Sequence, residues 1–122
     1  MGKVTKFILK VGATGSTARW VAKHYMRLSK EGFTDNEIFH ELVTFRYKVF
    51  KMQGVEEKLR QRLSYITNLS DLTFSILQLE GALKTKNMPM DMQMEALSVI
   101  MEELKKAGVP NEIITKTNTD GV

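Results

Sequence analysis

Apolar residues recur every three or four positions along most of the chain, which is the spacing of one buried face of an α-helix. Glycine and proline interrupt this pattern at Gly32, at Gly54 and in the segment 108–110. The pattern therefore predicts helices over residues 17–31, 35–52, 55–86 and 91–107, followed by a short helical turn over 110–115. The expected fold is a single all-α domain over residues 1–116, a bundle of four to five helices.

Local signals mark where several of these helices begin. Thr34 and Glu37 form a capping box, in which each side chain accepts a hydrogen bond from the other residue's free backbone N–H. Residues 68–71 resemble a stop followed by a new N-cap. Helical apolar spacing nevertheless continues across that segment, at Leu69, Leu72, Ile76, Leu79 and Leu83. Residues 55–86 are therefore expected to form either one long helix or two.

Both ends of the chain are predicted to be less regular than its middle. Residues 4–11 alternate loosely and are rich in β-branched and aromatic side chains, so we expect a short extended arm. This arm and a flexible glycine-rich lead at Gly12 and Gly15 together span residues 1–14. The tail 117–122 is polar, has nothing to bury and is expected to be disordered.

Composition narrows the class of protein. The chain has 122 residues, of which 43% are hydrophobic and 26% charged, as in one ordinary globular domain. It contains no cysteine, which excludes disulfides, thiolate metal sites and cysteine nucleophiles. Its apolar runs are far shorter than the roughly 20 residues that a membrane span needs. We expect a cytoplasmic protein that makes no membrane contact.

Charge is distributed unevenly along the chain. Residues 1–62 hold 13 of the 18 Lys and Arg residues but only 6 of the 14 Asp and Glu residues. This excess predicts an anionic partner for the first half, or a head-to-tail contact between neighbouring copies. The basic residues of helix 17–31 form one stripe with Trp20 at its edge: Arg19, Lys23, Arg27 and Lys30. Such a stripe fits a nucleic-acid backbone with the tryptophan stacking, an acidic protein surface, or a solvated outer face.

The segment KFILKVGATGSTARWVA resembles the strand-turn-helix that holds a pyrophosphate in nicotinamide-dependent dehydrogenase-like proteins. Gly12, Gly15 and Ala18 stand at the glycine spacing of that motif, and the resemblance covers about 17 residues. It implies a dinucleotide whose phosphates meet backbone N–H groups at a helix N-terminus. The second strand and ribose-binding residue of such a site do not follow, so no cofactor is predicted.

The segment LSKEGFTDNEIFHEL is similar to the first two helices of the DNA-binding domain of quorum-sensing-type response regulators. This resemblance implies a helix-turn-helix that binds DNA. In that family a turn and a short recognition helix come next, whereas here the helical pattern continues from Val43 to Met52. Capping at Gly32 and at Thr34 with Glu37 explains most of the similarity.

Candidate catalytic and metal-binding residues are few. Glu37 and His40 match one quarter of a carboxylate-bridged di-iron bundle, but His24 has Val21 where the matching glutamate is needed. No metal is therefore predicted. No Ser, Thr or Lys has a histidine or carboxylate at a recognisable catalytic spacing, which favours a protein that is not an enzyme.

Apolar residues in the second half predict self-association. The spacing from Leu69 to Leu83 forms one seam, and four of the eight methionines alternate around Pro89: Met88, Met90, Met92 and Met94. We expect a homo-oligomer formed through residues 69–104. The predicted function is a non-catalytic helical interaction module that self-associates and presents its basic N-terminal half to an anionic partner. The alternative is a helix-turn-helix-like nucleic-acid-binding protein that uses helices 17–31 and 35–52.

Two charged residues fall on apolar helix faces. At about 100° per residue, Arg46 lies between Leu42 and Phe39 on the wheel of helix 35–52. Glu80 lies in the same way among the apolar residues of the segment that follows Leu72. An unpaired charge there costs several kcal/mol, so we predict that Arg46 and Glu80 meet across the helix interface. The alternatives are that both head groups extend to water, or that Arg46 binds an anionic ligand.

Overall fold

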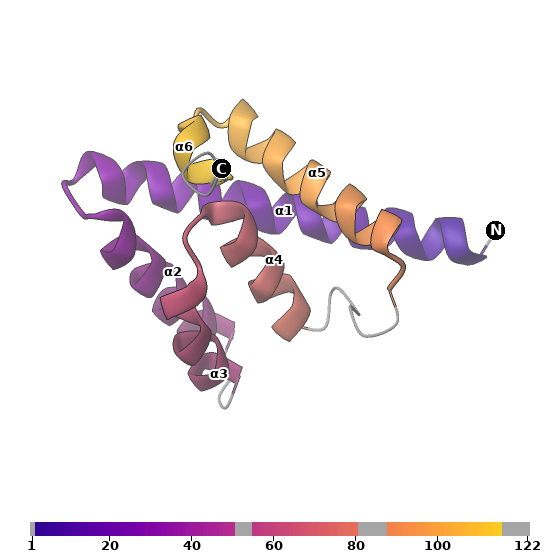
Figure 1. The fold of residues 1–122 in the computed structure, drawn as a ribbon, viewed down its shortest axis with the longest axis horizontal. Helices are drawn as coiled ribbons and strands as arrows, with labels where there is room; N and C mark the ends of the chain where they lie inside the picture. Colours follow the sequence, from indigo (N-terminus) through magenta and orange to yellow (C-terminus); the bar gives the residue numbers. More distant parts are fainter. Residues whose placement is uncertain (1, 51–54, 81–87, 116–122) are drawn as a thin grey trace, which may run out of the picture.

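The computed structural model describes residues 2–50, 55–80 and 88–115, with side chains for 12–48, 57–80 and 88–115. These ranges contain helices and no strand, so the all-α prediction is confirmed. In chain order the elements are α1 (Gly2–Lys30), α2 (Asp35–Phe50), α3 (Val55–Arg62), the 3-10 turn η1 (Leu63–Tyr65), α4 (Leu69–Leu79), α5 (Met90–Lys106) and α6 (Asn111–Ile114). Helix α1 runs the length of the molecule, and α4 lies between α2 and α5 (Figure 1).

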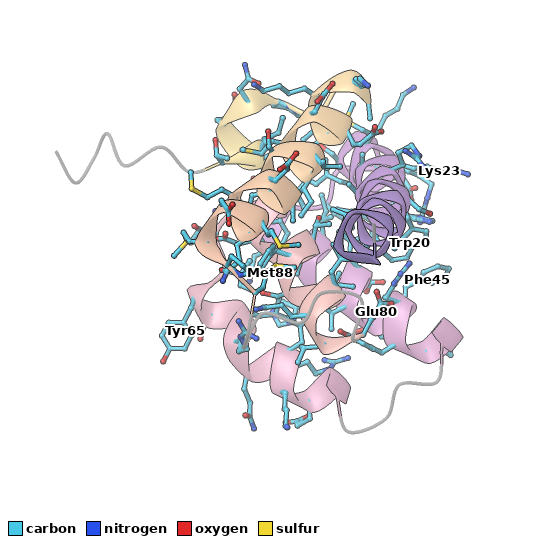
Figure 2. The ribbon with its side chains drawn as sticks, turned by 90° about the vertical axis from the view of Figure 1, so that its right-hand side faces the viewer. Trp20, Lys23, Phe45, Tyr65, Glu80 and Met88 are labelled. Atoms are coloured by element: carbon cyan, nitrogen blue, oxygen red, sulfur yellow. The ribbon has the colours of Figure 1, made fainter. Side chains whose placement is uncertain are left out.

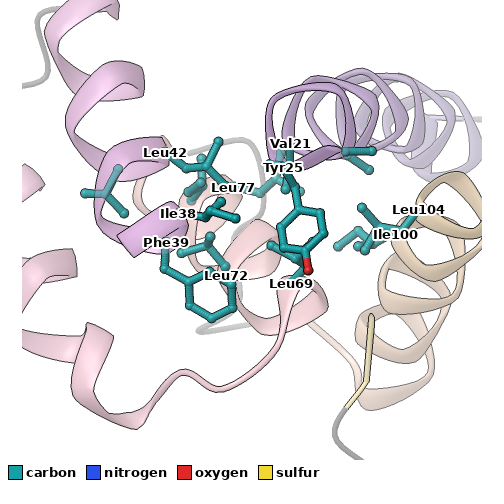
Figure 3. Close-up of a cluster of buried hydrophobic side chains, with 14 of the residues drawn as sticks. Val21, Tyr25, Ile38, Phe39, Leu42, Leu69, Leu72, Leu77, Ile100 and Leu104 are labelled. Carbon is teal, nitrogen blue, oxygen red and sulfur yellow. The ribbon is translucent and has the colours of Figure 1, made fainter. Parts of the chain in front are cut away.

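The core fills the space between α1, α2, α4 and α5 (Figure 3). Each helix contributes the apolar face that its sequence spacing predicts, and these side chains are almost fully buried. The largest contributors include Val21, Tyr25, Ile38, Leu42, Leu72, Leu77, Ile100 and Leu104. Burial of a Val or Leu side chain contributes about 1.5–3 kcal/mol, so this shared core holds the four helices in place.

The helix ends follow the local signals in the sequence. Gly32 ends α1 with a positive φ of 99°, and Phe33 N–H donates to the Leu28 carbonyl over 3.1 Å. Gly108 ends α5 in the same way with a φ of 91°. Both are left-handed caps that glycine adopts without a steric penalty. The capping box that opens α2 is present: Thr34 N–H donates to Glu37 Oε1 over 2.8 Å, and Glu37 N–H donates to Thr34 Oγ1 over 3.2 Å.

Tyr25 fixes the angle between α1 and α2. Its side chain is buried, and its hydroxyl donates to Asp35 Oδ1 in the first turn of α2 over 2.9 Å. Burial and this hydrogen bond raise the pKa of Tyr25 to about 12. The contact joins α1, which carries the predicted basic stripe, to the start of α2.

The predicted extended arm is wrong, because α1 begins at Gly2 and includes the whole of residues 4–14. Gly12 and Gly15 therefore lie inside a helix rather than in a flexible lead. Gly15 lies on the side of α1 that faces α5: a Cβ there would be 3.9 Å from Glu103 Cγ and 4.0 Å from Val99 Cγ1, which is ordinary packing distance, and 3.3 Å from Arg19 Nη1. Thr14 and Ala18 are also buried. Packing against α5 thus outweighs the low helix propensity of glycine, about 1 kcal/mol per residue.

The segment 55–86 forms separate helices where the structure describes it. Helix α3 ends at Arg62, and Asn68 caps the new helix α4 by accepting a hydrogen bond from Asp71 N–H over 2.9 Å. Helix α5 begins at Met90, one residue before the predicted start at residue 91, with Pro89 at the N-cap position. Gly54, Leu83 and the predicted disordered tail 117–122 lie outside the described residues.

Candidate functional site

Three aromatic rings from α1 and α2 meet at the surface of the molecule. Trp20 and Phe45 stack with ring centroids 5.9 Å apart and planes inclined by 18°. The His24 ring lies 4.7 Å from that of Trp20 and 5.3 Å from that of Phe45. Phe45 remains 46% exposed. Single exposed apolar residues are ordinary on a protein surface, but an exposed ring within a cluster of rings is informative.

Basic side chains flank these rings. Lys23 lies one helical turn after Trp20, and Lys48 lies one turn after Phe45; both are exposed. Figure 2 shows Trp20, Lys23 and Phe45 on the same side of the molecule, opposite Tyr65. We call the following residues the basic aromatic face: Trp20, Lys23, His24, Arg27, Phe45 and Lys48.

The structure divides the predicted basic stripe. Arg19 forms an ion pair with Glu103 of α5 over 3.2 Å, and Arg27 forms one with Glu31 over 3.0 Å. Lys23 has no ion pair within the described part of the chain. Lys30 is the last residue of α1 and lines a depression with Tyr25, Arg27 and Pro110.

His24 contributes to this face as a neutral ring. Partial burial lowers its pKa, and the positive charges of Arg27 and Lys23 lower it further. Its Nδ1 lies 3.3 Å from Arg27 Nη2 and can accept a hydrogen bond from it. Near pH 7 the face therefore takes its positive charge from Lys23, Arg27 and Lys48 rather than from the imidazole.

Beneath the rings, Arg46 and Glu80 form the ion pair that the helix faces predict. Arg46 Nε donates to Glu80 Oε2 over 2.9 Å, and Arg46 Nη2 donates to Glu80 Oε1 over 3.1 Å. Their side chains are 10% and 13% exposed, so neither head group extends to water. This two-bond geometry is the strong form of an arginine–carboxylate contact.

Two further contacts of Arg46 were not predicted. Nη2 also donates to Thr17 Oγ1 of α1 over 3.3 Å, and the guanidinium carbon lies 4.9 Å from the centroid of the Trp20 ring. A cation over an indole face is favourable. The Arg46 guanidinium thus contacts the inner side of Trp20 and also bonds Glu80 at the C-cap of α4. The anionic group that binds Arg46 in this structure is the Glu80 carboxylate.

Sequence reasoning also missed His24 and Phe45 as members of the site. His24 lies one turn after Trp20, a signal that was available. The position of Phe45 opposite Trp20 depends on how α1 and α2 cross. No spacing within either helix could have shown that contact.

The other candidate sites are not formed as their motifs require. The segment that resembles a dinucleotide-binding turn lies within α1, so its glycines form no phosphate cradle. Helix α2 continues to Phe50 without the turn of a helix-turn-helix recognition unit. The Glu37 carboxylate serves in the capping box, and no group of three or more potential metal ligands occurs among the described residues.

Comparison of the chain with protein-family models, with curated proteins and with solved structures finds no match in any of the three. Within the described ranges, every helix is too short or too polar to cross a membrane.

Proposed function

We propose that this chain is a non-catalytic helical interaction module that binds an anionic partner with its basic aromatic face. The observation that carries the proposal is the exposed Phe45, stacked on Trp20 and flanked by lysines that have no ion pair within the described chain. The buried Arg46–Glu80 pair holds this face rigid from below. A rigid surface loses less conformational entropy on binding.

Titration with inorganic polyphosphate at low and moderate salt tests this proposal. Trp20 is the only tryptophan, so its fluorescence reports directly on the face. Binding should weaken steeply with salt, because cations on the protein displace counterions from the polyanion. Lys23→Gln should lower the slope of log K against log salt by about one unit, as loss of one phosphate contact does.

The control for this experiment is Lys105→Gln, which removes an exposed lysine of α5 outside the face. It should leave the salt slope unchanged. Equal effects of the two substitutions mean that binding reflects net charge alone, and absence of binding at low salt refutes the proposal.

Self-association is a second, separate part of the proposed function. Most of the predicted seam is used inside a single chain, since Leu69, Leu72 and Ile76 are fully buried. The outer face of α5 remains available, with Met90 68% and Met94 63% exposed. Two copies of α5 in antiparallel order would also bring Asp91 of one towards the Lys105 and Lys106 end of the other, which favours pairing.

A further inference from the structure

The chemistry of the basic aromatic face identifies a class of anionic partner. Exposed cations attract phosphate groups and acidic peptides alike, so charge alone does not distinguish these partners. The face also exposes Phe45, with Trp20 stacked at 18° to it and His24 at 5.3 Å. Flat rings beside cations are the combination that binds single-stranded nucleic acid, because every base has a π-face and every nucleotide a phosphate.

The surrounding charges favour a single strand over a duplex. The exposed side of α2 carries Glu37 and Glu41 as well as Phe45 and Lys48. Insertion of α2 into a major groove would place those carboxylates near phosphates, which opposes binding. An unpaired strand can instead follow α1, where Lys23 and Arg27 succeed Trp20 at steps of one turn. Helix α1 contains no acidic residue, and Glu31, which directly follows it, is paired with Arg27.

The rings of the basic aromatic face are held in place by the protein itself, without a ligand. Arg46 lies under Trp20 at 4.9 Å and is bound by Glu80 and Thr17, so the tryptophan is supported by groups from three helices. Trp20 in turn supports Phe45. A base that stacks on Phe45 therefore meets a ring whose orientation is already fixed, and little entropy is lost in ordering it.

We infer that the basic aromatic face binds single-stranded nucleic acid, with a base stacked on Phe45 and neighbouring phosphates at Lys23 and Lys48. This inference rests on the proposed function, since it names the anionic partner of the same face.

The experiment compares three probes of the full chain at one salt concentration: oligothymidylate of about ten nucleotides, an oligomer of the same length with abasic sites throughout, and inorganic polyphosphate. Trp20 fluorescence measures all three affinities, and anisotropy of end-labelled oligomers checks the first two. Oligothymidylate should bind about tenfold more tightly than the abasic strand, the effect of one stacked base. Equal affinities overturn the inference but leave the proposed function intact, whereas failure of every probe to bind overturns both.

Substitutions at Phe45 locate the stacking. Phe45→Leu should reduce the affinity for oligothymidylate to that for the abasic strand, and Phe45→Tyr should keep the preference because it keeps the ring. Tyr65→Leu is the matched control, since Tyr65 is 84% exposed on the other side of the molecule.

Circular dichroism checks that each variant is folded. If Phe45→Leu does not fold, Lys48→Gln replaces it and should lower the salt slope for the oligomer by about one unit. A preference for duplex over single strand, or an equal loss in Tyr65→Leu, overturns the inference.

Discussion

At the scale of single residues, Arg46 shows how a charge is accommodated inside a helical core. Burial removes most of its hydration, and the protein replaces it with two bonds to Glu80, one to Thr17 and the face of Trp20. A buried pair of this kind gives little net stability compared with apolar residues of similar size. Its contribution here is positional, because it fixes Trp20 relative to α2 and α4.

Removal of either partner of this pair should be costly. We expect Arg46→Ala and Glu80→Ala each to lower the free energy of unfolding by about 3–5 kcal/mol, since each leaves an uncompensated buried charge. The double variant should lose much less than the sum of the two, as expected for residues in direct contact. Chemical denaturation of the four proteins measures this coupling.

The apolar double replacement Arg46→Met with Glu80→Leu tests whether the ion pair positions Trp20 rather than stabilises the fold. It should fold with near-native stability, because removal of both charges leaves neither of them unpaired. Small and additive losses in the two alanine variants would contradict a buried pair. Phosphate that stabilises the wild type, but not Arg46→Ala, against heat would instead identify Arg46 as an anion site.

At the scale of helices, the sequence predicts the caps and the buried face of each helix, but it does not predict how distant helices pack together. Gly32, Gly108 and the Thr34–Glu37 box act within a few residues, so their effects follow from the residues themselves. The Arg46–Glu80 contact was predictable because both helix faces were amphipathic. The length of α1 was not, because its middle part packs against α5: Gly15 lies beside Val99 and Glu103, which are more than 80 positions further along the chain.

Gly12 gives a direct test of the long first helix. A Cβ at this position meets nothing within 4 Å, so alanine fits without strain. Within a helix, Gly12→Ala should raise the free energy of unfolding by about 0.5–1 kcal/mol. Thermal and chemical denaturation measure this gain. An extended arm at this position predicts no such gain, and an unchanged stability would therefore contradict the helix.

At the scale of the whole molecule, part of the charge asymmetry is used internally. The ion pairs Arg19–Glu103 and Arg46–Glu80 each join the basic first half to the acidic second half within one chain. A head-to-tail contact between copies is therefore not needed to satisfy these four charges. Lys23 and Lys48 remain exposed beside the rings and supply positive charge to the basic aromatic face.

Self-association is also a property of the whole molecule, and its expected strength depends on the apolar surface that α5 leaves exposed. Met90 and Met94 are mostly exposed on α5, whereas Leu97 and Met101, which follow at steps of three and four, are partly buried against the core. One helix face covers far less than the roughly 800 Å² that each partner of a stable complex buries. We therefore expect a dimer only at high protein concentration, with light scattering giving a single-chain mass when the protein is dilute.

Met90→Gln combined with Met94→Gln should abolish the dimer without affecting the core, because both side chains are mostly exposed. Met26→Gln, at a methionine of α1 that is 37% exposed, is the control and should leave the dimer intact. A single-chain mass at every concentration, or equal dissociation in the control, would show that the outer face of α5 does not mediate self-association.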